Sequence, residues 1–192
     1  MDNLFKEIID CKRILREITL LRKLEHPCVV NLIEILQPEC PNSFNSIYVV
    51  MEYAESDLKK LVKSDIHLDL IHIKTMVYNL LRAVKYLHDS KVLHRDLKPA
   101  NLFLMSSGTI KVIDFGESKD LFKPDEDGGN ATTATIRGTP QYLSPILWKA
   151  HVVDGNSRFA KHNVYKSDIF SMGLLFYQMA VMEDVTGFNQ KS

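Results

Sequence analysis

Apolar residues recur at helical spacing in three long segments of the chain. Residues 10–24 carry an apolar face between basic side chains, and His26-Pro27 ends the pattern. Residues 70–89 carry the broadest stripe, which predicts a largely buried helix, and residues 167–182 predict an apolar helix. A short further helix is expected to begin near Asp57. The stripe of the longest helix comprises Ile73, Met76, Val77, Leu80, Leu81, Val84 and Leu87.

Short apolar runs between turn residues predict strands, at residues 29–36, 47–51, 101–104 and 109–113. Because Ser106-Ser107-Gly108 is typical of a tight turn, the last two strands are expected to form a hairpin. Two polar stretches, 117–137 and 151–166, carry no periodicity. A loop of about twenty residues inside a compact domain is expected to be functional or disordered.

The composition is that of a globular protein with balanced charge. Hydrophobic residues make up 45% and charged residues 25%, and Lys plus Arg equals Asp plus Glu at 24 each. This balance argues against nucleic acid or a membrane surface as a partner, so neither is expected. Cys11, Cys28 and Cys40 form no C-x-x-C pair, which fits a reducing compartment without a zinc motif. No apolar run approaches the ~18 residues of a membrane span, and we expect a cytoplasmic protein, with the nucleus as the alternative.

Four polar residues in two nearby loops match the needs of phosphoryl transfer. That reaction requires a base near the accepting hydroxyl, a cation near the phosphates and oxygen ligands for magnesium. Asp96 can serve as the base, and Lys98 can place a positive charge on the transferred phosphate. Asn101 and Asp114 offer the hard oxygen ligands that Mg²⁺ prefers. The expected hairpin would bring Asn101 and Asp114 within reach of one metal cluster.

These residues lie in two motifs that resemble those of eukaryotic protein kinases. His94-Arg95-Asp96-Leu97-Lys98-Pro99-Ala100-Asn101 resembles the catalytic loop, and Asp114-Phe115-Gly116 resembles the metal-binding loop. Six fixed residues would occur by chance with a frequency on the order of 10⁻⁸ per start position. The resemblance implies ATP and Mg²⁺ as cofactors and a protein as substrate, and Lys98-Pro99 favours the serine/threonine type.

The resemblance extends along the chain and implies an α+β, two-lobed protein kinase-like fold that is partial. Residues 1–192 would form one partial kinase domain, with the remnant of the N-lobe and the hinge at 1–53 and the C-lobe at 54–192. The catalytic loop would occupy 94–101 and the activation segment 114–146. The N-lobe would lack its first three strands, and the mainly helical C-lobe would lack its last helices.

The resemblance also implies roles for single residues. Glu17 matches the regulatory-helix glutamate that pairs with a strand lysine, and Asp168 matches the helix aspartate that holds the catalytic loop. Arg95 implies a partner anion, which in the family is a phosphorylated activation-loop residue, so an upstream activating kinase is expected. The nucleotide-binding positions are Met51 at the gatekeeper, Glu52 and Ala54 in the hinge, Asp57 at the ribose, and Phe103. The candidate regulatory threonines are Thr132, Thr133 and Thr135, and Thr139 is the candidate substrate-docking residue.

The match with the family fails at both ends of the chain. No G-x-G-x-x-G loop occurs, and residues 2–17 resemble the segment after the strand lysine in mitogen-activated protein kinases, so that lysine is expected upstream of Met1. Ser144-Pro145-Ile146 stands where the family has Ala-Pro-Glu. We expect both ends to come from an incomplete gene model, because they cut through one packed unit. We expect the chain as written to bind ATP weakly and to transfer phosphate slowly or not at all.

Two other functions stay open beside a protein kinase. A truncated, catalytically weak kinase-like binding module or scaffold would explain the missing lysine and Gly-rich loop, but not the joint presence of all four catalytic residues. A small-molecule kinase is disfavoured by Lys98-Pro99 and by the activation-loop ending Gly138-Thr139-Pro140. The Thr-x-Tyr motif of mitogen-activated protein kinases is absent, so the sequence assigns no subfamily or pathway.

Overall fold

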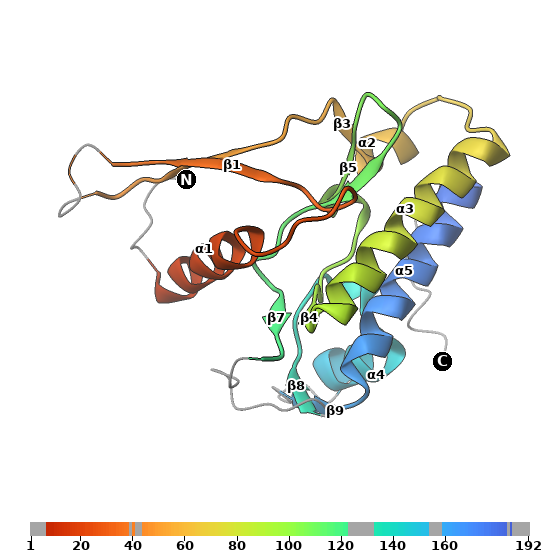
Figure 1. Ribbon diagram of the computed structural model, residues 1–192. Coiled ribbons are helices and arrows are strands. Elements are labelled where there is room, and N and C mark those ends of the chain that lie inside the picture. Colours follow the sequence, from red (N-terminus) through yellow and green to blue (C-terminus); the bar gives the residue numbers. More distant parts are fainter. Residues whose placement is uncertain are drawn as a thin grey trace.

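Helices and short strands are divided between a smaller and a larger part of the molecule (Figure 1). The computed structural model describes residues 7–38, 40, 44–122, 133–153, 159–183 and 185, without the side chains of 133–135, 152–153 and 159. The helices are α1 (Ile8–Leu21), α2 (Leu58–Val62), α3 (Leu70–Asp89), α4 (Pro145–Trp148) and α5 (Val164–Val181). The strands are β1 (Leu32–Leu36), β2 (Tyr48–Met51), β3 (Ser56–Asp57), β4 (Val92–Leu93), β5 (Leu102–Leu104), β6 (Ile110–Val112), β7 (Lys119–Asp120), β8 (Thr133–Thr135) and β9 (Phe159–Lys161). Single turns of 3-10 helix cover Pro99–Asn101 and Pro140–Tyr142, and a π-helical turn covers Lys149–Val153.

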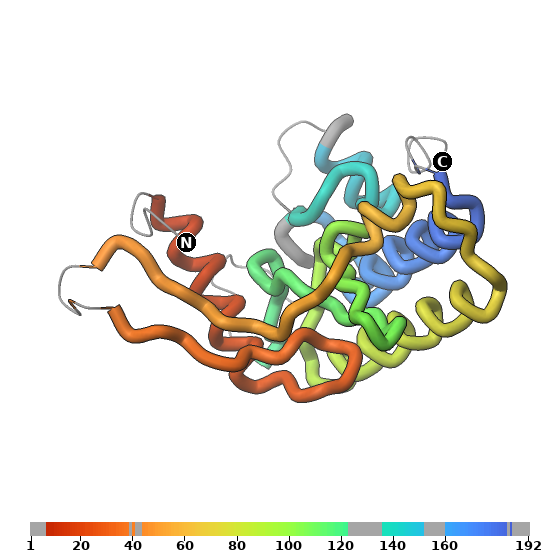
Figure 2. The backbone as a smooth tube through the Cα atoms, turned by 90° about the horizontal axis from the view of Figure 1, so that it is seen from above, coloured from red at the N-terminus to blue at the C-terminus, as the bar shows by residue number. Residues whose placement is uncertain are grey.

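The smaller part consists of α1 and of two strands beside it. β1 and β2 pair antiparallel, from Leu32 opposite Met51 to Leu36 opposite Tyr48. In Figure 2 this part, drawn in red and orange, extends away from the helices of the larger part. α1 buries only Leu20 and Leu21, so the smaller part has little core of its own. Its exposed apolar side chains are Ile8, Ile9, Leu15, Ile33, Leu36, Tyr48 and Val50.

The larger part contains the predicted hairpin. β5 and β6 pair antiparallel, and β3 adds to the outer edge of β5 in the order β3-β5-β6. Gly108 closes the turn with a φ of +75°, where a glycine carries no steric penalty. β4 pairs with β7, and β8 pairs with β9. The hairpin prediction is therefore confirmed, and it places the residues before β5 next to those after β6.

α3 and α5 lie side by side and supply most of the helical core (Figure 1). α3 buries Leu80, Val84 and Leu87, and α5 buries Leu175 and Met179, all in one cluster. The prediction that α3 is largely buried is wrong for its outer face, where Tyr78 and Leu81 are 60% and 43% exposed. Only one side of α3 is covered by β6 and α5, so the broad stripe extends past the covered side.

The element ends differ from the sequence prediction where local capping decides them. α5 begins at Val164 instead of residue 167, because the Asn163 side chain accepts a hydrogen bond from the Tyr165 N–H at 3.1 Å. β1 begins at Leu32 instead of residue 29. The residues before it bond to β6 instead, with Val30 N donating to Val112 O at 3.0 Å.

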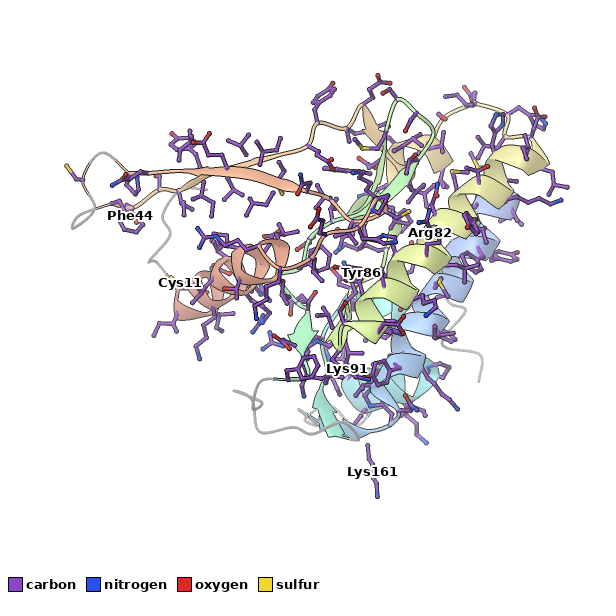
Figure 3. The ribbon with its side chains drawn as sticks, in the orientation of Figure 1. Cys11, Phe44, Arg82, Tyr86, Lys91 and Lys161 are labelled. Atoms are coloured by element: carbon purple, nitrogen blue, oxygen red, sulfur yellow. The ribbon has the colours of Figure 1, made fainter. Side chains whose placement is uncertain are left out.

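The segment after α1 is fastened to α3. Tyr86 points from α3 toward this segment (Figure 3), and its hydroxyl accepts a hydrogen bond from the Glu25 N–H at 2.9 Å. The His26 ring stacks on Tyr86 with centroids 4.8 Å apart. Burial, with Arg82 and Lys111 nearby, lowers the pKa of His26 and favours its neutral form. These contacts fix the smaller part against the larger one.

Candidate active site

A buried carboxylate on α5 holds the backbone of the catalytic loop. Asp168 is 2% exposed and accepts hydrogen bonds from the His94 N–H at 3.0 Å and from the Arg95 N–H at 2.8 Å. Arg95 has a φ of +66°, a conformation that is strained for a residue with a side chain. The two hydrogen bonds therefore stabilise an otherwise unfavourable turn just before Asp96. This is the role that the kinase resemblance implied for Asp168.

The charge of Asp168 is supported by its partners. Burial alone would raise the pKa of this carboxyl, but the hydrogen bond from His88, the nearby His94 ring and the Arg95 N–H outweigh burial and lower it. His88 reaches Asp168 from α3, with Nε2 2.9 Å from Oδ2. The ionised form is therefore favoured, and the carboxylate ties α3, α5 and the loop together.

The His94 side chain links the catalytic loop to the metal-binding loop. Its Nε2 lies 2.9 Å from the carbonyl oxygen of Ile113, and its ring meets Phe115 edge-on with centroids 5.3 Å apart. The Ser118 hydroxyl donates to the His94 carbonyl at 3.3 Å. Both His94 and Phe115 are fully buried. These three contacts hold the two loops together.

Asp96 lies at the centre of a dense set of hydrogen bonds. Its Oδ2 accepts from Lys98 Nζ at 2.6 Å and from Asn101 Nδ2 at 3.2 Å. Its Oδ1 accepts from both the N–H and the hydroxyl of Thr139, each at 2.8 Å. Lys98 also donates to the Thr139 hydroxyl at 3.0 Å. The structure therefore brings Asp96, Lys98, Asn101 and Thr139 into one cluster.

Asn101 and Asp114, the predicted magnesium ligands, lie on the two sides of the β5–β6 hairpin and carry oxygen atoms of the kind that Mg²⁺ takes. Both hydrogen bonds from the Asn101 side chain, to the Asp96 carbonyl and carboxylate, use its amide nitrogen, so its oxygen is the atom left for a metal. The Ile113 N–H donates to the Asn101 carbonyl at 3.0 Å, which brings Asp114 next to Asn101. Asp114 has a φ of +63°, and one of its oxygens accepts from the Gly116 N–H at 3.3 Å. Mg²⁺ takes few protein ligands besides phosphate and water, and the assignment of these two residues to it stays a prediction.

The hinge candidates differ in whether their polar groups already have a partner within the protein. Glu52 donates its N–H to Asn31 at 3.2 Å, and its carboxylate pairs with Lys111 Nζ at 2.5 Å. The Ala54 N–H has no hydrogen-bond acceptor among the described residues, and its contact with adenine stays a prediction. Met51 ends β2 and packs against the main core.

Asp57 and Phe103 lie opposite each other in the β3–β5 pair. Phe103 is partly buried against the core, on the strand that follows the catalytic loop. Asp57 also caps α2, because its Oδ1 accepts from the Lys60 N–H at 2.9 Å and its Oδ2 lies 3.6 Å from Lys60 Nζ. The cap is a structural role for Asp57, and the ribose contact stays a prediction.

Glu17 faces the metal-binding loop from α1. Burial and the negative charge of Asp114 raise the pKa of Glu17 from 4.5 to about 6, although a hydrogen bond with the Phe115 backbone opposes the rise. Within the described part of the chain, no lysine or arginine forms an ion pair with this carboxylate. The neighbouring Arg16 instead donates to the carbonyl of Gly116. Among the described residues, Glu17 is therefore repelled by Asp114 and has no ion-pair partner of its own.

Arginines gather around Glu117 in the activation segment. Arg13 of α1 pairs with Oε1 at 2.6 Å, and Arg137 lies 3.5 Å from Oε2. Arg95 donates from Nε to the Glu117 carbonyl at 2.6 Å and from Nη2 to the Ser118 carbonyl at 3.2 Å. The predicted regulatory sites Thr133 and Thr135 lie in β8, whereas Thr132 lies outside the described residues. The expected contact of Arg95 with a phosphorylated threonine stays a prediction.

Gly138 sets the distance between the activation segment and the catalytic loop. Its φ is +109°, and a Cβ atom there would lie 2.4 Å from the carbonyl oxygen of Arg95. Only glycine permits this approach, and Thr139 follows directly. The sequence names Thr139 for substrate docking. Its two hydrogen bonds to Asp96, 43 positions away, carry no sequence signal.

The chain belongs to the protein kinase family, since residues 3–191 match the protein kinase domain. This confirms the predicted family and the partial, kinase-like α+β fold. The serine/threonine kinase NLK of Caenorhabditis elegans is 36% identical over 179 residues, which are 93% of this chain and 26% of that protein. Mitogen-activated protein kinases 9 and 10 of Oryza sativa subsp. japonica are 38% and 39% identical over 177 residues, which are 92% of this chain and 24% and 27% of those proteins.

These relatives bear out the serine/threonine type and the resemblance to mitogen-activated protein kinases. The chain spans about a quarter of the length of the curated relatives it matches. None of the helices described is long and apolar enough to cross a membrane.

Proposed function

We propose that the protein carrying this chain is a serine/threonine protein kinase that transfers the γ-phosphoryl group of ATP to a Ser or Thr hydroxyl of a protein. The observation that carries the proposal is the cluster in which Lys98, Asn101 and Thr139 hold the Asp96 carboxylate. Membership of the protein kinase family supports the same reaction class. Phosphoryl transfer depends mainly on positioning and electrostatics, which is what such a rigid polar cluster can provide.

In this proposal Asp96 accepts the proton of the substrate hydroxyl. A carboxylate has about four lone-pair sites, and the four hydrogen bonds to Asp96 use all of them. An incoming hydroxyl must therefore replace one. Because Lys98 and Asn101 hold Oδ2, the hydroxyl would take a place now used by Thr139 on Oδ1. The Thr139 hydroxyl can then keep its hydrogen bond from Lys98.

Asn101 and Asp114 are the proposed magnesium ligands, and the Ala54 N–H and Phe103 belong to the proposed adenine site. Bound together with ATP, Mg²⁺ supplies neutralisation of the charge on the phosphates. Lys98, 27% exposed at its side chain, adds a cation on the side of Asp96. Arg95 remains the proposed partner of a phosphate placed on the activation segment by an upstream kinase.

A catalytically weak binding module or scaffold is the second candidate. Two observations favour it for the chain as written. The apolar surface of α1, β1 and β2 is exposed, and Glu17 faces Asp114 without an ion-pair partner in the described residues. Both features would weaken the proposed nucleotide site on the side of α1, β1 and β2.

A phosphotransfer assay separates the two candidates. The longest natural product of the gene that contains this chain is incubated with Mg-ATP and a mixed protein acceptor, as wild type and as Asp96→Asn. We expect Asp96→Asn to lower the rate by about 10²-fold or more, as for loss of a general base. Asp65→Asn, at an exposed loop position, is the matched control and should leave the rate unchanged. Equal rates for wild type and Asp96→Asn would reject Asp96 as the base, and an inactive wild type would favour the scaffold.

A further inference from the structure

A cleft of about 480 Å³ opens directly beside the Asp96 cluster. Lys98 and Thr139, both bonded to Asp96, form one end of its lining. From there the cleft extends between α2 and the end of α5, where Met182 lines it. A peptide that presents a hydroxyl to Asp96 would therefore continue into this cleft.

The charges that line the cleft are all positive. Lys59 of α2 and Lys63, the residue directly after α2, join Lys98 in the lining, and no Asp or Glu is among the lining residues. Lys98 is already paired with Asp96 at 2.6 Å, so Lys59 and Lys63 provide the uncompensated charge. No carboxylate in the described ranges lies within ion-pair distance of either of these two lysines. A concave surface with one sign of charge concentrates its field and attracts ions of the opposite sign.

The packing of α2 fixes this lysine pair toward the cleft. Leu58 and Leu61 are 0% and 6% exposed, and they anchor the opposite face of the helix in the core. Lys63 caps the C-terminal end of α2 with a helical backbone conformation. It lies four residues after Lys59, so the two side chains are neighbours on one face. Like charges at this spacing repel each other and weaken the helix slightly, a cost that a bound anion would remove. The other lysine of α2, Lys60, is not among the lining residues and pairs with Asp57 at 3.6 Å.

The catalytic-loop side of the cleft leaves room for such an anion. Ala100 also lines the cleft, and its methyl group carries no charge that could neutralise the lysines. Val62 and Pro99 add apolar surface that suits the aliphatic part of a peptide. The lining thus combines uncharged side chains with the two lysines.

We propose that Lys59 and Lys63 select protein substrates that carry Asp or Glu side chains within a few residues of the acceptor Ser or Thr. This proposal rests on the proposed kinase function, because it identifies the substrate class of the same site. It is nevertheless a statement about peptide binding, so it can be tested without phosphoryl transfer. The carboxylate of the substrate would lie between the two lysine ammonium groups, and the hydroxyl would lie at Asp96.

Peptide binding measured by fluorescence anisotropy tests the selection. Serine peptides that differ only in Glu, Gln or Lys near the serine are titrated with the wild-type chain and with Lys59→Glu/Lys63→Glu. We expect the wild type to bind the Glu peptide most tightly. The double charge reversal should weaken that binding by about tenfold and improve binding of the Lys peptide, in line with two exposed ion pairs. Lys74→Glu, at an exposed position of α3 outside the cleft lining, is the matched control and should leave the preference unchanged.

Several other results of this titration would overturn the proposal. Equal affinity of the wild type for the three peptides, or no binding of any, would overturn the proposal, as would an unchanged preference in the double variant. If a phosphoserine peptide binds and the Glu peptide does not, the lysines recognise a phosphate instead of a carboxylate, and the proposal is overturned. Phosphotransfer to the same peptides is measured in parallel. Phosphate transfer without a preference for the Glu peptide would reject the selection by the lysines and keep the kinase function. A binding preference for the Glu peptide without phosphate transfer would keep the selection and reject the kinase function.

Discussion

Glu17 should make the folded chain less stable as the pH rises. The pKa of its carboxyl is raised from 4.5 to about 6 by burial and by Asp114. Because the folded state holds this proton more tightly than the unfolded chain, the stabilisation is fully present below pH 4.5 and is lost as the pH rises through about 6. The difference between the two pKa values corresponds to about 2 kcal/mol at full effect. Partial exposure of the side chain reduces the expected value to about 1 kcal/mol.

The substitution Glu17→Gln isolates this effect. Glutamine keeps the shape and an oxygen that can accept the Phe115 backbone hydrogen bond, but it cannot ionise. We expect the variant to match the wild type in free energy of unfolding below pH 4.5 and to exceed it by about 1 kcal/mol above pH 6. Urea unfolding at the two pH values measures the difference. Glu55→Gln, at an exposed loop position, controls for the loss of one negative charge.

The contribution of Asp114 can be separated from that of burial. Asp114→Asn removes the repulsion, so the gain from Glu17→Gln should shrink in the Asp114→Asn background. A gain from Glu17→Gln that is equal at both pH values would refute the reasoning, because it would show that the proton on Glu17 is not linked to folding. A larger stability of the wild type at high pH would contradict the sign.

Two further substitutions test the scaffold of the active site. Asp168→Asn should lower the free energy of unfolding by about 2–4 kcal/mol at neutral pH, because the buried N–H groups of the catalytic loop lose a charged acceptor. The lowered pKa of Asp168 means that the wild type itself loses this stabilisation as the pH falls below 3.8, so the two proteins should converge in acid, and a constant difference would contradict this account. Gly138→Ala should cost about 1–3 kcal/mol, because its Cβ would lie 2.4 Å from the Arg95 carbonyl oxygen. Gly173→Ala, in α5 with no atom within 4 Å of the added Cβ, should instead stabilise by about 0.5–1 kcal/mol in urea unfolding, and equal effects of the two alanines would refute the steric argument.

Long periodic elements and contiguous motifs were predictable from the sequence, and short or tertiary features were not. α3, α5 and the β5–β6 hairpin have enough residues to show a period or a turn signal. β3, β4 and β7 have two residues each, and they exist only because a neighbouring strand pairs with them. The exposed outer face of α3 depends on which elements cover it, and this cannot be read from its own stripe.

In the candidate site, too, the residues of one contiguous motif were predictable and the contacts between distant segments were not. Asp96, Lys98 and Asn101 are close in sequence, so the motif names them together. Thr139 comes from a loop 43 positions away, and its contact with Asp96 requires the close approach at Gly138. His88 likewise meets Asp168 across 80 positions, from another helix. The pair Lys59 and Lys63 reads as ordinary helix surface until the cleft beside it is known.

The central claim is that Asp96 handles the proton while Asn101 and Asp114 hold the metal. The most direct test is the single-turnover phosphotransfer rate of the longest natural product of the gene as a function of Mg²⁺ concentration, for its wild type, Asp96→Asn and Asp114→Asn forms. We expect Asp96→Asn to lower the maximal rate and leave the midpoint for Mg²⁺ unchanged, and Asp114→Asn to raise that midpoint by about tenfold or more. An unchanged Mg²⁺ midpoint in Asp114→Asn, or an unchanged maximal rate in Asp96→Asn, would contradict the account.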